Sequence, residues 1–484
     1  MDWFTDMKCA FTIDHELYAQ LQAHLFPGDG DEHGAVIAAG ISQDEGEVRF
    51  LARELILAVE GKDYLPSKVG HRCLSATFVA QTIEYCATRN LCYFAVHCHP
   101  GTNSVGFSAI DIDSHERGYP ALLDISHGGP VGALVFARDA VAGDIWFSSS
   151  HRLQLAHVTV VGPQIHRLYP KPRRIPKAPA FHDRHVRLFG DLGQSILGGL
   201  KVGIIGLGGG GSLISEWISR LGVGEIIAID DQRIESTNVP RVVGSTLLDS
   251  MSWLSDSKVP VLANFGRRMS RTKVSIAKRV AKKANSRIKY RAVRGSVLDE
   301  KVATTLKNCD FVFLATDNIQ SRLVFNALVN QYLIPGAQIG IKINPDRDSK
   351  QIESILLNTR IVMPYPGGGC LECHELIPAS MLQEESLTPE ARRRQRYIDI
   401  DEVPEPSVIT LNVLSAAQAT NDLMMLFTGL YSDGVNLFHL QGEATRREWF
   451  TISSTVRPTC PDCSSHPKSR RAMGDRVRLP CKQK

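Results

Sequence analysis

Two histidines and an aspartate in the first third of the chain have residue types and spacing suited to binding zinc. His97 and His99 are separated by one residue, and Asp111 follows on the same stretch of chain. Side chains two positions apart on a β-strand point to the same face, so both imidazoles could reach one ion. Three protein ligands leave a fourth tetrahedral position for water, whose pKa zinc lowers to about 7. We therefore expect a hydrolytic zinc site.

Two more side chains could complete this site, one as a base and one as a hydrogen-bond donor. Glu32 precedes the first apolar run and is the candidate general base, although Glu45 and Glu47 lie nearby. Ser108, three residues before Asp111, could hydrogen-bond the oxyanion of a tetrahedral intermediate. The order Glu, His-x-His-Pro, Ser-x-x-Asp resembles that of the JAMM (Mov34/MPN) metalloproteases. The resemblance implies hydrolysis of a peptide or isopeptide bond after the C-terminus of a ubiquitin-like protein; the alternative is a metal-free relative that only binds.

A glycine-rich segment further along the chain has the spacing of a nucleotide-binding loop. Gly206, Gly208 and Gly211 follow a strand-like apolar run and precede a helix-like one. Backbone amides at such a helix N-terminus can bind phosphate. Asp230, at the end of the next apolar run, suits ribose hydroxyls. Taken alone, these features fit an NAD-dependent dehydrogenase equally well.

Polar residues after the glycine loop favour a nucleoside triphosphate. Asn238 and Arg241 could reach phosphates, and Lys273 could neutralise phosphate charge. Asp317 and Asn318 end a later strand, where a carboxylate could hold Mg²⁺ on the triphosphate. Each residue also has a simpler interpretation, since Lys273 could be a solvated helix charge and Asn238 a turn residue.

Arg187, ahead of the first strand of this region, completes a longer pattern. Over residues 182–465 the series arginine, GxGxxG, D…NxxR, lysine and TDN resembles the ubiquitin-activating-like (ThiF/HesA/MoeB) family. The resemblance implies that ATP and Mg²⁺ activate the C-terminal carboxylate of a ubiquitin-like protein as an acyl-adenylate. It also implies that Asp317 holds the metal and that Arg187 reaches the site of a partner subunit in a homodimer. An oxidoreductase is disfavoured, because hydride transfer gives Asp317, Lys273 and Arg187 no role.

The eleven cysteines are scattered except for two Cys-x-x-Cys pairs. This distribution fits a reducing compartment with a metal site better than a disulfide framework. Four thiolates are enough for a closed tetrahedral zinc site, which resembles the structural zinc of the same activating family. The four ligands would be Cys370, Cys373, Cys460 and Cys463.

Many members of the activating family carry an acyl-accepting cysteine just before their late helices, and this chain has none there. No cysteine occurs between Cys373 and Cys460, and Ser407 occupies the corresponding place. Ser407 could accept the acyl group as an oxyester, because an acyl-adenylate is a very reactive donor. Alternatively, Ser407 only N-caps the following helix and the enzyme stops at the adenylate.

The elements that must position these residues indicate an α/β protein of two domains. Residues 1–165 read as an α+β JAMM-like domain, with strands at 35–41, 92–99 and 132–137 and a helix at 75–90. A proline-rich, basic linker spans 166–181. Strand–helix alternation over 182–465 predicts a Rossmann-like, doubly wound adenylating domain with the four-cysteine zinc site. We expect the basic tail 466–484 to be disordered.

Bulk composition excludes several other classes of protein. The chain has 484 residues, of which 43% are hydrophobic and 22% charged, with a net charge of +4 at pH 7. That charge is too small to indicate a nucleic-acid partner. No apolar run approaches the ~20 residues that span a bilayer, and the acidic N-terminus lacks the pattern of a signal peptide. We expect a cytoplasmic protein with no membrane partner.

The main hypothesis is a bifunctional enzyme that activates a ubiquitin-like modifier and also matures it or removes it from targets. Its partners would be the modifier, a conjugating enzyme and a second copy of the chain. Such fusions resemble those of bacterial ubiquitin-like operons, some of which are linked to antiphage defence. One alternative is sulfur-carrier activation for cofactor or amino-acid biosynthesis. Another, of a different class, is a non-catalytic adaptor that binds a modifier without turnover.

Overall fold

The computed structural model describes residues 7–44, 46–65, 72–345, 352–387 and 407–482. The fold divides into two compact units, each with its own sheet. Unit 1 comprises Met1–Ile175, Asn330–Leu333 and Cys463–Arg478; unit 2 comprises Pro176–Val329, Ile334–Asp462 and Leu479–Lys484. Among the described residues, no helix has the length and apolarity needed to cross a bilayer.

Unit 1 is built on an eight-stranded sheet of order β1-β3-β2-β4-β5-β6-β7-β8, in which β1 also pairs with β7. Its strands are β1 (Lys8–Asp14), β2 (Gly34–Asp44), β3 (Glu47–Leu57), β4 (Cys92–Cys98), β5 (Val131–Phe136), β6 (Val141–Ser148), β7 (His151–Val161) and β8 (His166–Leu168). Its helices are α1 (His15–Leu25), α2 (Ala76–Thr88) and α3 (Ala109–Ile125). The strands and the helix expected from the sequence all form here, within three residues of their expected bounds.

Alternate residues of the central strands of unit 1 point into two apolar clusters. Ile37 of β2 packs in the cluster that contains Leu21 of α1. Its neighbour Val36 points the other way and packs in the cluster that contains Phe78 of α2 and Tyr119 of α3. The two-residue period of a strand therefore buries both faces of β2, as expected for its continuous apolar sequence.

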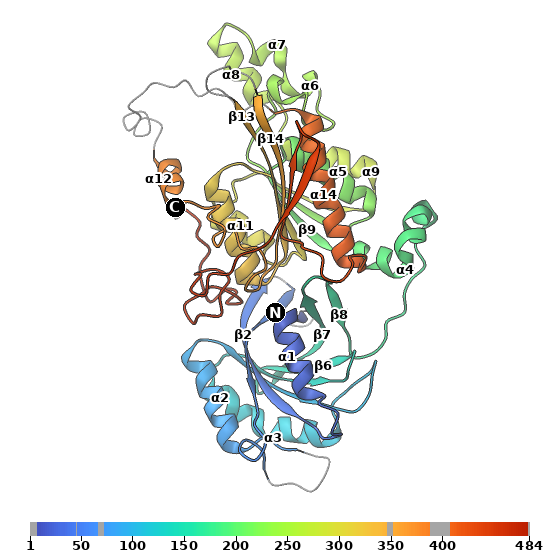
Figure 1. Cartoon of the computed structure of the whole chain (residues 1–484), viewed down its shortest axis with the longest axis vertical. Coiled ribbons are helices and arrows are strands. Elements are labelled where there is room, and N and C mark those ends of the chain that lie inside the picture. The colour runs from blue at the N-terminus through green and yellow to red at the C-terminus, as the bar shows by residue number, and fades with distance from the viewer. Residues whose placement is uncertain (1–6, 45, 66–71, 346–351, 388–406, 483–484) are drawn as a thin grey trace. The chain divides into compact units, whose positions relative to one another are not determined.

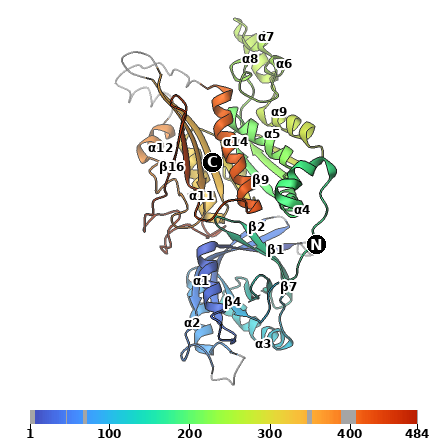
Figure 2. The same ribbon diagram turned by 45° about the vertical axis from the view of Figure 1, so that its right-hand side comes forward.

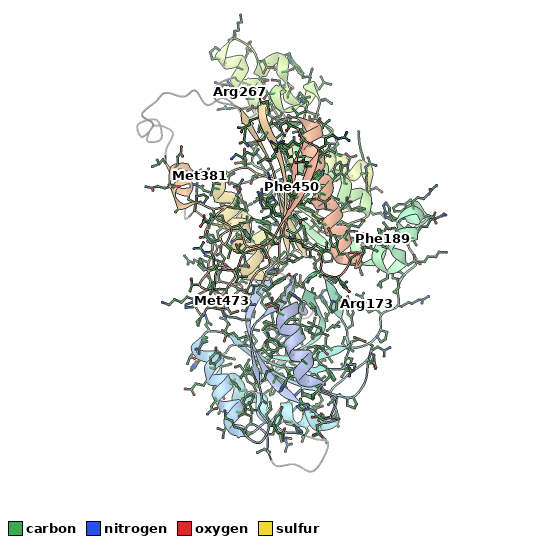
Figure 3. The ribbon with its side chains drawn as sticks, in the orientation of Figure 1. Arg173, Phe189, Arg267, Met381, Phe450 and Met473 are labelled. Carbon is green, nitrogen blue, oxygen red and sulfur yellow. The ribbon has the colours of Figure 1, made fainter. Side chains whose placement is uncertain are left out.

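Unit 2 contains the doubly wound sheet predicted from the sequence, of order β11-β10-β9-β12-β13-β14-β15-β16. Its first five strands in this order are parallel and the last three antiparallel. The strands are β9 (Lys201–Ile205), β10 (Glu225–Ile229), β11 (Lys289–Val293), β12 (Phe311–Leu314), β13 (Gly336–Pro345), β14 (Ile352–Val362), β15 (His439–Glu443) and β16 (Glu448–Ile452). β16 is the edge strand, and its Phe450 is half-exposed (Figure 3).

Helices cover both faces of this sheet. Helices α5, α9 and α14 lie on one face and α11 on the other (Figure 1 and Figure 2). The helices of this part of the chain are α4 (Asp183–Gly199), α5 (Gly209–Leu221), α6 (Leu247–Ser250), α7 (Ser252–Ser255), α8 (Pro260–Met269), α9 (Lys273–Ala284), α10 (Glu300–Ala303), α11 (Ile319–Tyr332), α12 (Ala379–Ser386) and α14 (Ile409–Thr428). Three short 3₁₀ helices are η1 (Ala180–His182), η2 (Ser236–Asn238) and η3 (Thr304–Leu306). Strand order reverses between β9 and β12, where nucleotides bind in open α/β sheets.

The segment after the last cysteine pair corrects one expectation. Residues 466–482 are not a disordered tail in the structure, and most of them pack within unit 1. The Arg471 guanidinium, 3% exposed, donates to Asp14 Oδ2 at 2.8 Å and to the Arg53 carbonyl at 3.0 Å. Met473 packs against the apolar cluster that contains Phe78 of α2. The basic composition of this segment suggested a solvated tail. In the structure, burial of Arg471 and its ion pair with Asp14 hold the segment in place.

The Arg471–Asp14 pair provides a test of this packing. Replacing Arg471 by alanine leaves the Asp14 carboxylate, 1% exposed, without its cation, so we expect unit 1 to lose about 3 kcal/mol of stability. Hydrogen exchange of the β1 amides in urea measures this loss. Lys468→Ala, at an exposed position of the same segment, is the control and should change stability by less than about 0.5 kcal/mol. Equal stability of the two variants would contradict the packing.

Candidate active sites

The predicted zinc ligands of unit 1 converge in space. His97 Nε2 lies 3.2 Å from His99 Nε2 and 3.6 Å from Asp111 Oδ1, and His99 Nε2 lies 3.4 Å from Asp111 Oδ2. A tetrahedral zinc ion bound at 2.0–2.1 Å separates its ligand atoms by roughly 3.3 Å. The three side chains therefore fit one zinc ion and leave its fourth position open.

The pairing of β2 with β4 explains how Glu32 reaches the same place. These strands are antiparallel, with Gly34 opposite His97. Continuing that register by two residues sets Glu32 opposite His99, and Glu32 Oε1 lies 3.8 Å from His99 Nε2. The other ring nitrogen of His99 is 3.1 Å from the Gly106 carbonyl, which fixes the orientation of the imidazole. Of the nearby glutamates, Glu47 instead pairs with Arg49, and Glu45 lies outside the described residues.

The first turn of α3 holds Asp111 in position. The Ser108 amide donates to Asp111 Oδ2 at 2.7 Å, and the Asp111 amide donates to Ser108 Oγ at 3.2 Å, which forms a capping box. Burial alone would raise the pKa of Asp111, but hydrogen bonds from His97 and Ser108 hold that pKa well below its usual range. Asp111 is therefore ionised at neutral pH, as a zinc ligand must be. The exposed Ser108 serves as the helix N-cap here, which leaves its predicted oxyanion role a proposal.

A buried histidine–aspartate pair anchors α3 one turn further along, and sequence reasoning missed it. His115 Nδ1 lies 3.1 Å from Asp144 Oδ2, and the Trp146 indole donates to the same oxygen at 3.0 Å. His115 is 6% exposed and Asp144 fully buried. The available signal was the four-residue spacing of Asp111 and His115, which puts both on one face of a helix. The partner Asp144, on β6, could not be found without the fold.

The glycine loop of unit 2 closes tightly between β9 and α5. Gly206 has φ +90°, and a Cβ there would lie 2.6 Å from Thr316 Cγ2. A Cβ on Gly211 would lie 1.9 Å from the Gly206 carbonyl oxygen, so both positions require glycine. Around Gly208, by contrast, no described atom comes within 4 Å of a Cβ. The loop therefore presents open backbone at the N-terminus of α5, where a phosphate can approach.

Lys273 is buried beside this loop, and Asp230 is half-buried there. Asp230 accepts hydrogen bonds from the Leu207 amide at 2.8 Å and the Gln232 amide at 2.9 Å. Burial raises the pKa of Asp230, and the nearby Lys273 opposes that rise. Lys273 is 5% exposed and donates to Gln232 Oε1 at 2.6 Å, so it is not a solvated helix charge. Burial lowers the pKa of Lys273, which the charge of Asp230 opposes.

The other predicted nucleotide residues lie on the turns after β10 and β12. Asn238 is buried in η2, and its carbonyl accepts from the Arg241 amide at 3.0 Å; Arg241 in turn helps to lower the pKa of Lys273. Asn318 Oδ1 caps the first turn of α11 by accepting from the Ser321 amide at 2.7 Å. Asp317 is exposed at the end of β12.

Arg187 lies on an exposed part of α4. Its guanidinium pairs with Asp183, one turn earlier, at 2.9 Å. Within the described part of one chain, Arg187 thus makes a surface ion pair with Asp183, and its predicted reach into a partner subunit remains a prediction.

The four paired cysteines form one buried cluster. Their Sγ atoms all lie within 4.8 Å of one another, and Cys370 Sγ is 3.8 Å from Cys460 Sγ. Zinc bound by thiolates at 2.3 Å separates the sulfur atoms by roughly 3.8 Å. The side-chain amide nitrogen of Asn326, Nδ2, donates a hydrogen bond to Cys370 Sγ at 3.3 Å, and this bond would stabilise a thiolate. Cys370, Cys373, Cys460 and Cys463 thus fit a structural zinc site.

Ser407 does not cap the helix that follows it. The N-cap of α14 is Val408, and no side chain caps this helix. Ser407 Oγ instead accepts a hydrogen bond from Asn412 Nδ2 at 3.2 Å. The Asn412 side chain lies against Gly209, since a Cβ on that glycine would be 2.6 Å from Nδ2. Ser407 therefore stands close to the start of α5, and the capping interpretation is wrong.

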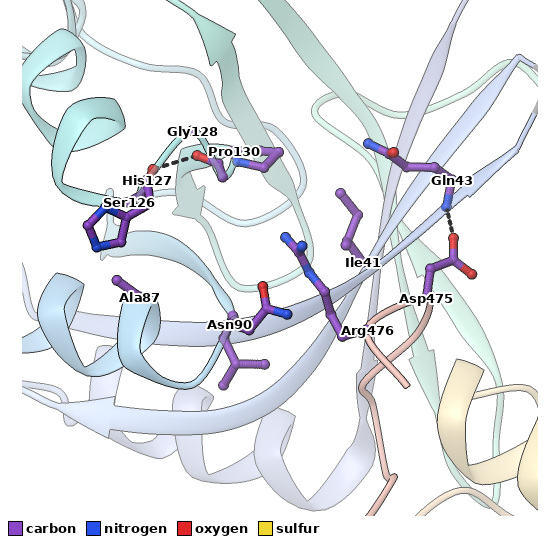
Figure 4. Close-up of a pocket in the computed structure, with 12 residues that line it drawn as sticks. Ile41, Gln43, Ala87, Asn90, Ser126, His127, Gly128, Pro130, Asp475 and Arg476 are labelled. Carbon is purple, nitrogen blue, oxygen red and sulfur yellow. Dashed lines mark hydrogen bonds between the residues drawn. The ribbon is translucent and has the colours of Figure 1, made fainter. Parts of the chain in front are cut away.

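Unit 1 also contains a cavity of about 380 Å³ that none of the predicted site residues lines (Figure 4). It lies where α2 and α3 end, at Asn90 and His127, which adopt left-handed φ values of 56° and 54°. Arg476 of the C-terminal segment also lines it. Helix C-termini carry partial negative charge, which a guanidinium complements. The lining of the cavity thus comes from the ends of α2 and α3, from β2 and from the C-terminal segment.

Comparisons with known proteins concern the second unit. The ThiF family model matches residues 182–461, more than half of the chain. The molybdopterin-synthase adenylyltransferase of Haemophilus influenzae is 25% identical over 143 residues, which are 30% of this chain and 51% of that protein. The chain thus spans about half the length of this curated relative.

Two solved structures align with a comparable part of the chain. E. coli MccB with ATP aligns at 21% identity and a TM-score of 0.42, over 59% of this chain and 75% of that one. PaaA aligns at 16% identity and a TM-score of 0.41, over 56% of this chain and 82% of that one.

Metal content tests the two clusters separately. We expect two zinc ions per chain by mass spectrometry of the purified protein. His99→Ala and Cys373→Ser should each lower the content to one ion, because each removes one ligand from a different cluster. Cys73→Ser, at an exposed position outside both clusters, should retain two. Two ions in the His99→Ala, Cys373→Ser double variant would contradict both assignments.

Proposed function

Because the chain belongs to the ThiF family, we propose that residues 182–461 catalyse ATP-dependent adenylation of the C-terminal carboxylate of a ubiquitin-like protein. The observation that carries this proposal is the open glycine loop after β9, beside the end of β12, where strand order reverses. Nucleotides bind at that point of open α/β sheets, and the first amides of α5 would hold the phosphates.

The charged residues around the loop suit a triphosphate. Lys273 and Arg241 supply positive charge, and a buried lysine gains a strong partner when a phosphate binds. Asp317 would hold Mg²⁺, which takes one or two carboxylates together with phosphate oxygens. Asp230, with Oδ2 bonded to the loop, would also reach the ribose. Asn238 and Asn318 would orient the turns that carry these groups.

The reaction joins two anions, and the site offsets their repulsion. A carboxylate oxygen of the modifier attacks the α-phosphorus of ATP, and pyrophosphate leaves with the bonding electrons. Lys273, Arg241 and the N-terminus of α5 stabilise the charge that develops on the phosphate oxygens. In a homodimer, Arg187 of a second copy would help to stabilise this negative charge.

Ser407 is the proposed acceptor of the acyl group. Its hydrogen bond to Asn412, which lies on Gly209, supports a position near the acyl-adenylate. The product would be an oxyester, from which a conjugating enzyme takes the modifier. The sequence supports this choice, since no cysteine occurs between Cys373 and Cys460.

The proposed activity of unit 1 is zinc-dependent cleavage after the C-terminal tail of the same modifier. Zinc bound by His97, His99 and Asp111 would polarise the scissile carbonyl and activate water. Glu32 would take the proton of the attacking water and pass it to the leaving amine. The exposed Ser108 hydroxyl would donate to the developing oxyanion. Maturation and removal of the modifier would then share a chain with its activation.

A sulfur-carrier protein is the alternative substrate. The relative from Haemophilus influenzae is named as an adenylyltransferase of molybdopterin synthase, which favours this candidate over a non-catalytic adaptor. An acyl-adenylate that reacts with a sulfur donor, and never with Ser407, would identify this pathway.

Pyrophosphate exchange tests the adenylation site. With ATP and a peptide ending in Gly-Gly, Asp317→Ala should lower the exchange rate at least about 100-fold, because the carboxylate that holds Mg²⁺ is lost. Asp433→Ala, which removes an exposed carboxylate of the same unit, should exchange at the wild-type rate. Equal rates for both variants would exclude Asp317 as a metal ligand.

Peptide cleavage tests the role of Glu32. Glu32→Gln should retain zinc but cleave a fusion after its Gly-Gly sequence at least about 100-fold more slowly, because the base is lost. Glu47→Gln is the matched control, since Glu47 pairs with Arg49 and should not affect cleavage. If Glu47→Gln loses activity and Glu32→Gln does not, the assignment of the base is wrong.

A further inference from the structure

Asn412 connects Ser407 to the glycine loop, and we infer that it positions Ser407 for acyl transfer. The inference rests on the proposed role of Ser407 as acyl acceptor. Sequence reasoning gave no role to Asn412, which lies in the first turn of α14 and is half-buried.

The side-chain nitrogen of Asn412, Nδ2, donates two hydrogen bonds at the start of α14. Nδ2 donates to Ser407 Oγ at 3.2 Å and to the Val408 carbonyl at 3.0 Å. These bonds fix the side chain of Ser407 relative to the helix. No side chain caps α14. The hydrogen bonds of Asn412 therefore hold the residues before the helix in place, as a capping serine would otherwise do.

The glycine loop is shaped to receive this side chain. A Cβ on Gly209 would lie 2.6 Å from Asn412 Nδ2 and 2.9 Å from its Cγ, closer than real contacts allow. Around Gly208 the corresponding space is open. The absent side chain of Gly209 therefore lets Asn412 touch the loop, while the open backbone of Gly208 stays available to phosphate. Ser407 is thereby held beside the loop.

This arrangement favours a hydroxyl nucleophile. Asn412 donates to one lone pair of Ser407 Oγ, and the second lone pair is the one that would attack. Helices α5 and α14 both begin here, and their positive ends favour charge on an attacking oxygen. The hydrogen bond from Asn412 fixes the direction of Oγ, and its contribution is to hold the nucleophile in position.

The step balances without another reactant. Oγ forms a bond to the acyl carbon, and the bond from that carbon to the phosphate oxygen of AMP breaks. The leaving oxygen takes the bonding electrons, and the hydroxyl proton ends on the phosphate of AMP. The products are the Ser407 oxyester and AMP.

A synthetic peptidyl adenylate ending in Gly-Gly-AMP separates acyl transfer from adenylation. Mass spectrometry of the full-length protein measures acylation at Ser407, and pyrophosphate exchange with ATP and the free peptide measures the first half-reaction. Asn412→Leu retains a branched side chain against Gly209 but cannot donate. We expect its acylation rate to fall about tenfold, because the hydrogen bonds that hold Ser407 are lost, with exchange unchanged.

The controls distinguish failure of the inference from failure of the proposed function. Ser407→Ala should give no adduct, and Leu414→Ala, exposed on the same helix, should acylate at the wild-type rate. Wild-type acylation rates in Asn412→Leu would overturn the role of Asn412 while leaving Ser407 as the acceptor. Absence of an adduct in the wild-type protein would overturn both. An equal fall in exchange and acylation would show that Asn412 shapes the nucleotide loop instead, which also overturns the inference.

Discussion

Both candidate sites depend on the same constraint, the carboxyl end of a buried strand, where the chain turns toward a helix. In unit 1, β4 pairs in parallel with β5, and His97 and His99 lie at its carboxyl end, with Asp111 at the start of the next helix. In unit 2, the Gly206 turn lies at the carboxyl end of β9. Strand ends of this kind gather side chains and helix amides from separate stretches of sequence. The packing of the remaining strands and helices holds these strand ends in position.

Close approach of backbones is what makes the nucleotide loop. Gly206 and Gly211 touch each other and the end of β12, so larger residues would push α5 away from the sheet. Because Gly209 also lacks a side chain, the Asn412 side chain can pack directly against it. A few missing side chains therefore decide both where a phosphate can bind and where the proposed nucleophile stands.

Buried charges in both units are matched by partners, and this matching sets their protonation. Asp111 is held ionised by His97 and Ser108, whereas burial works against ionisation of Asp230 and Lys273 beside the loop. A nucleotide phosphate would relieve the cost of burying Lys273. Arg471 follows the same rule, because its ion pair with Asp14 compensates for burial. Composition alone cannot reveal such pairing, which is why the basic C-terminal segment looked disordered from the sequence.

The sequence by itself determined the features that depend on local order. Two- and three-residue spacings of histidines, cysteines and glycines, and the periodicity of apolar residues, predicted the doubly wound sheet, the glycine loop and both clusters of candidate metal ligands. The tertiary structure decided what depends on contacts between distant segments. The register of β2 on β4 sets Glu32 opposite His99, Asp144 meets His115 from another strand, and Asn412 meets Gly209 across two helices. Local periodicity depends only on residues that are close in the sequence. Contacts between distant side chains form only when the helices and strands pack together.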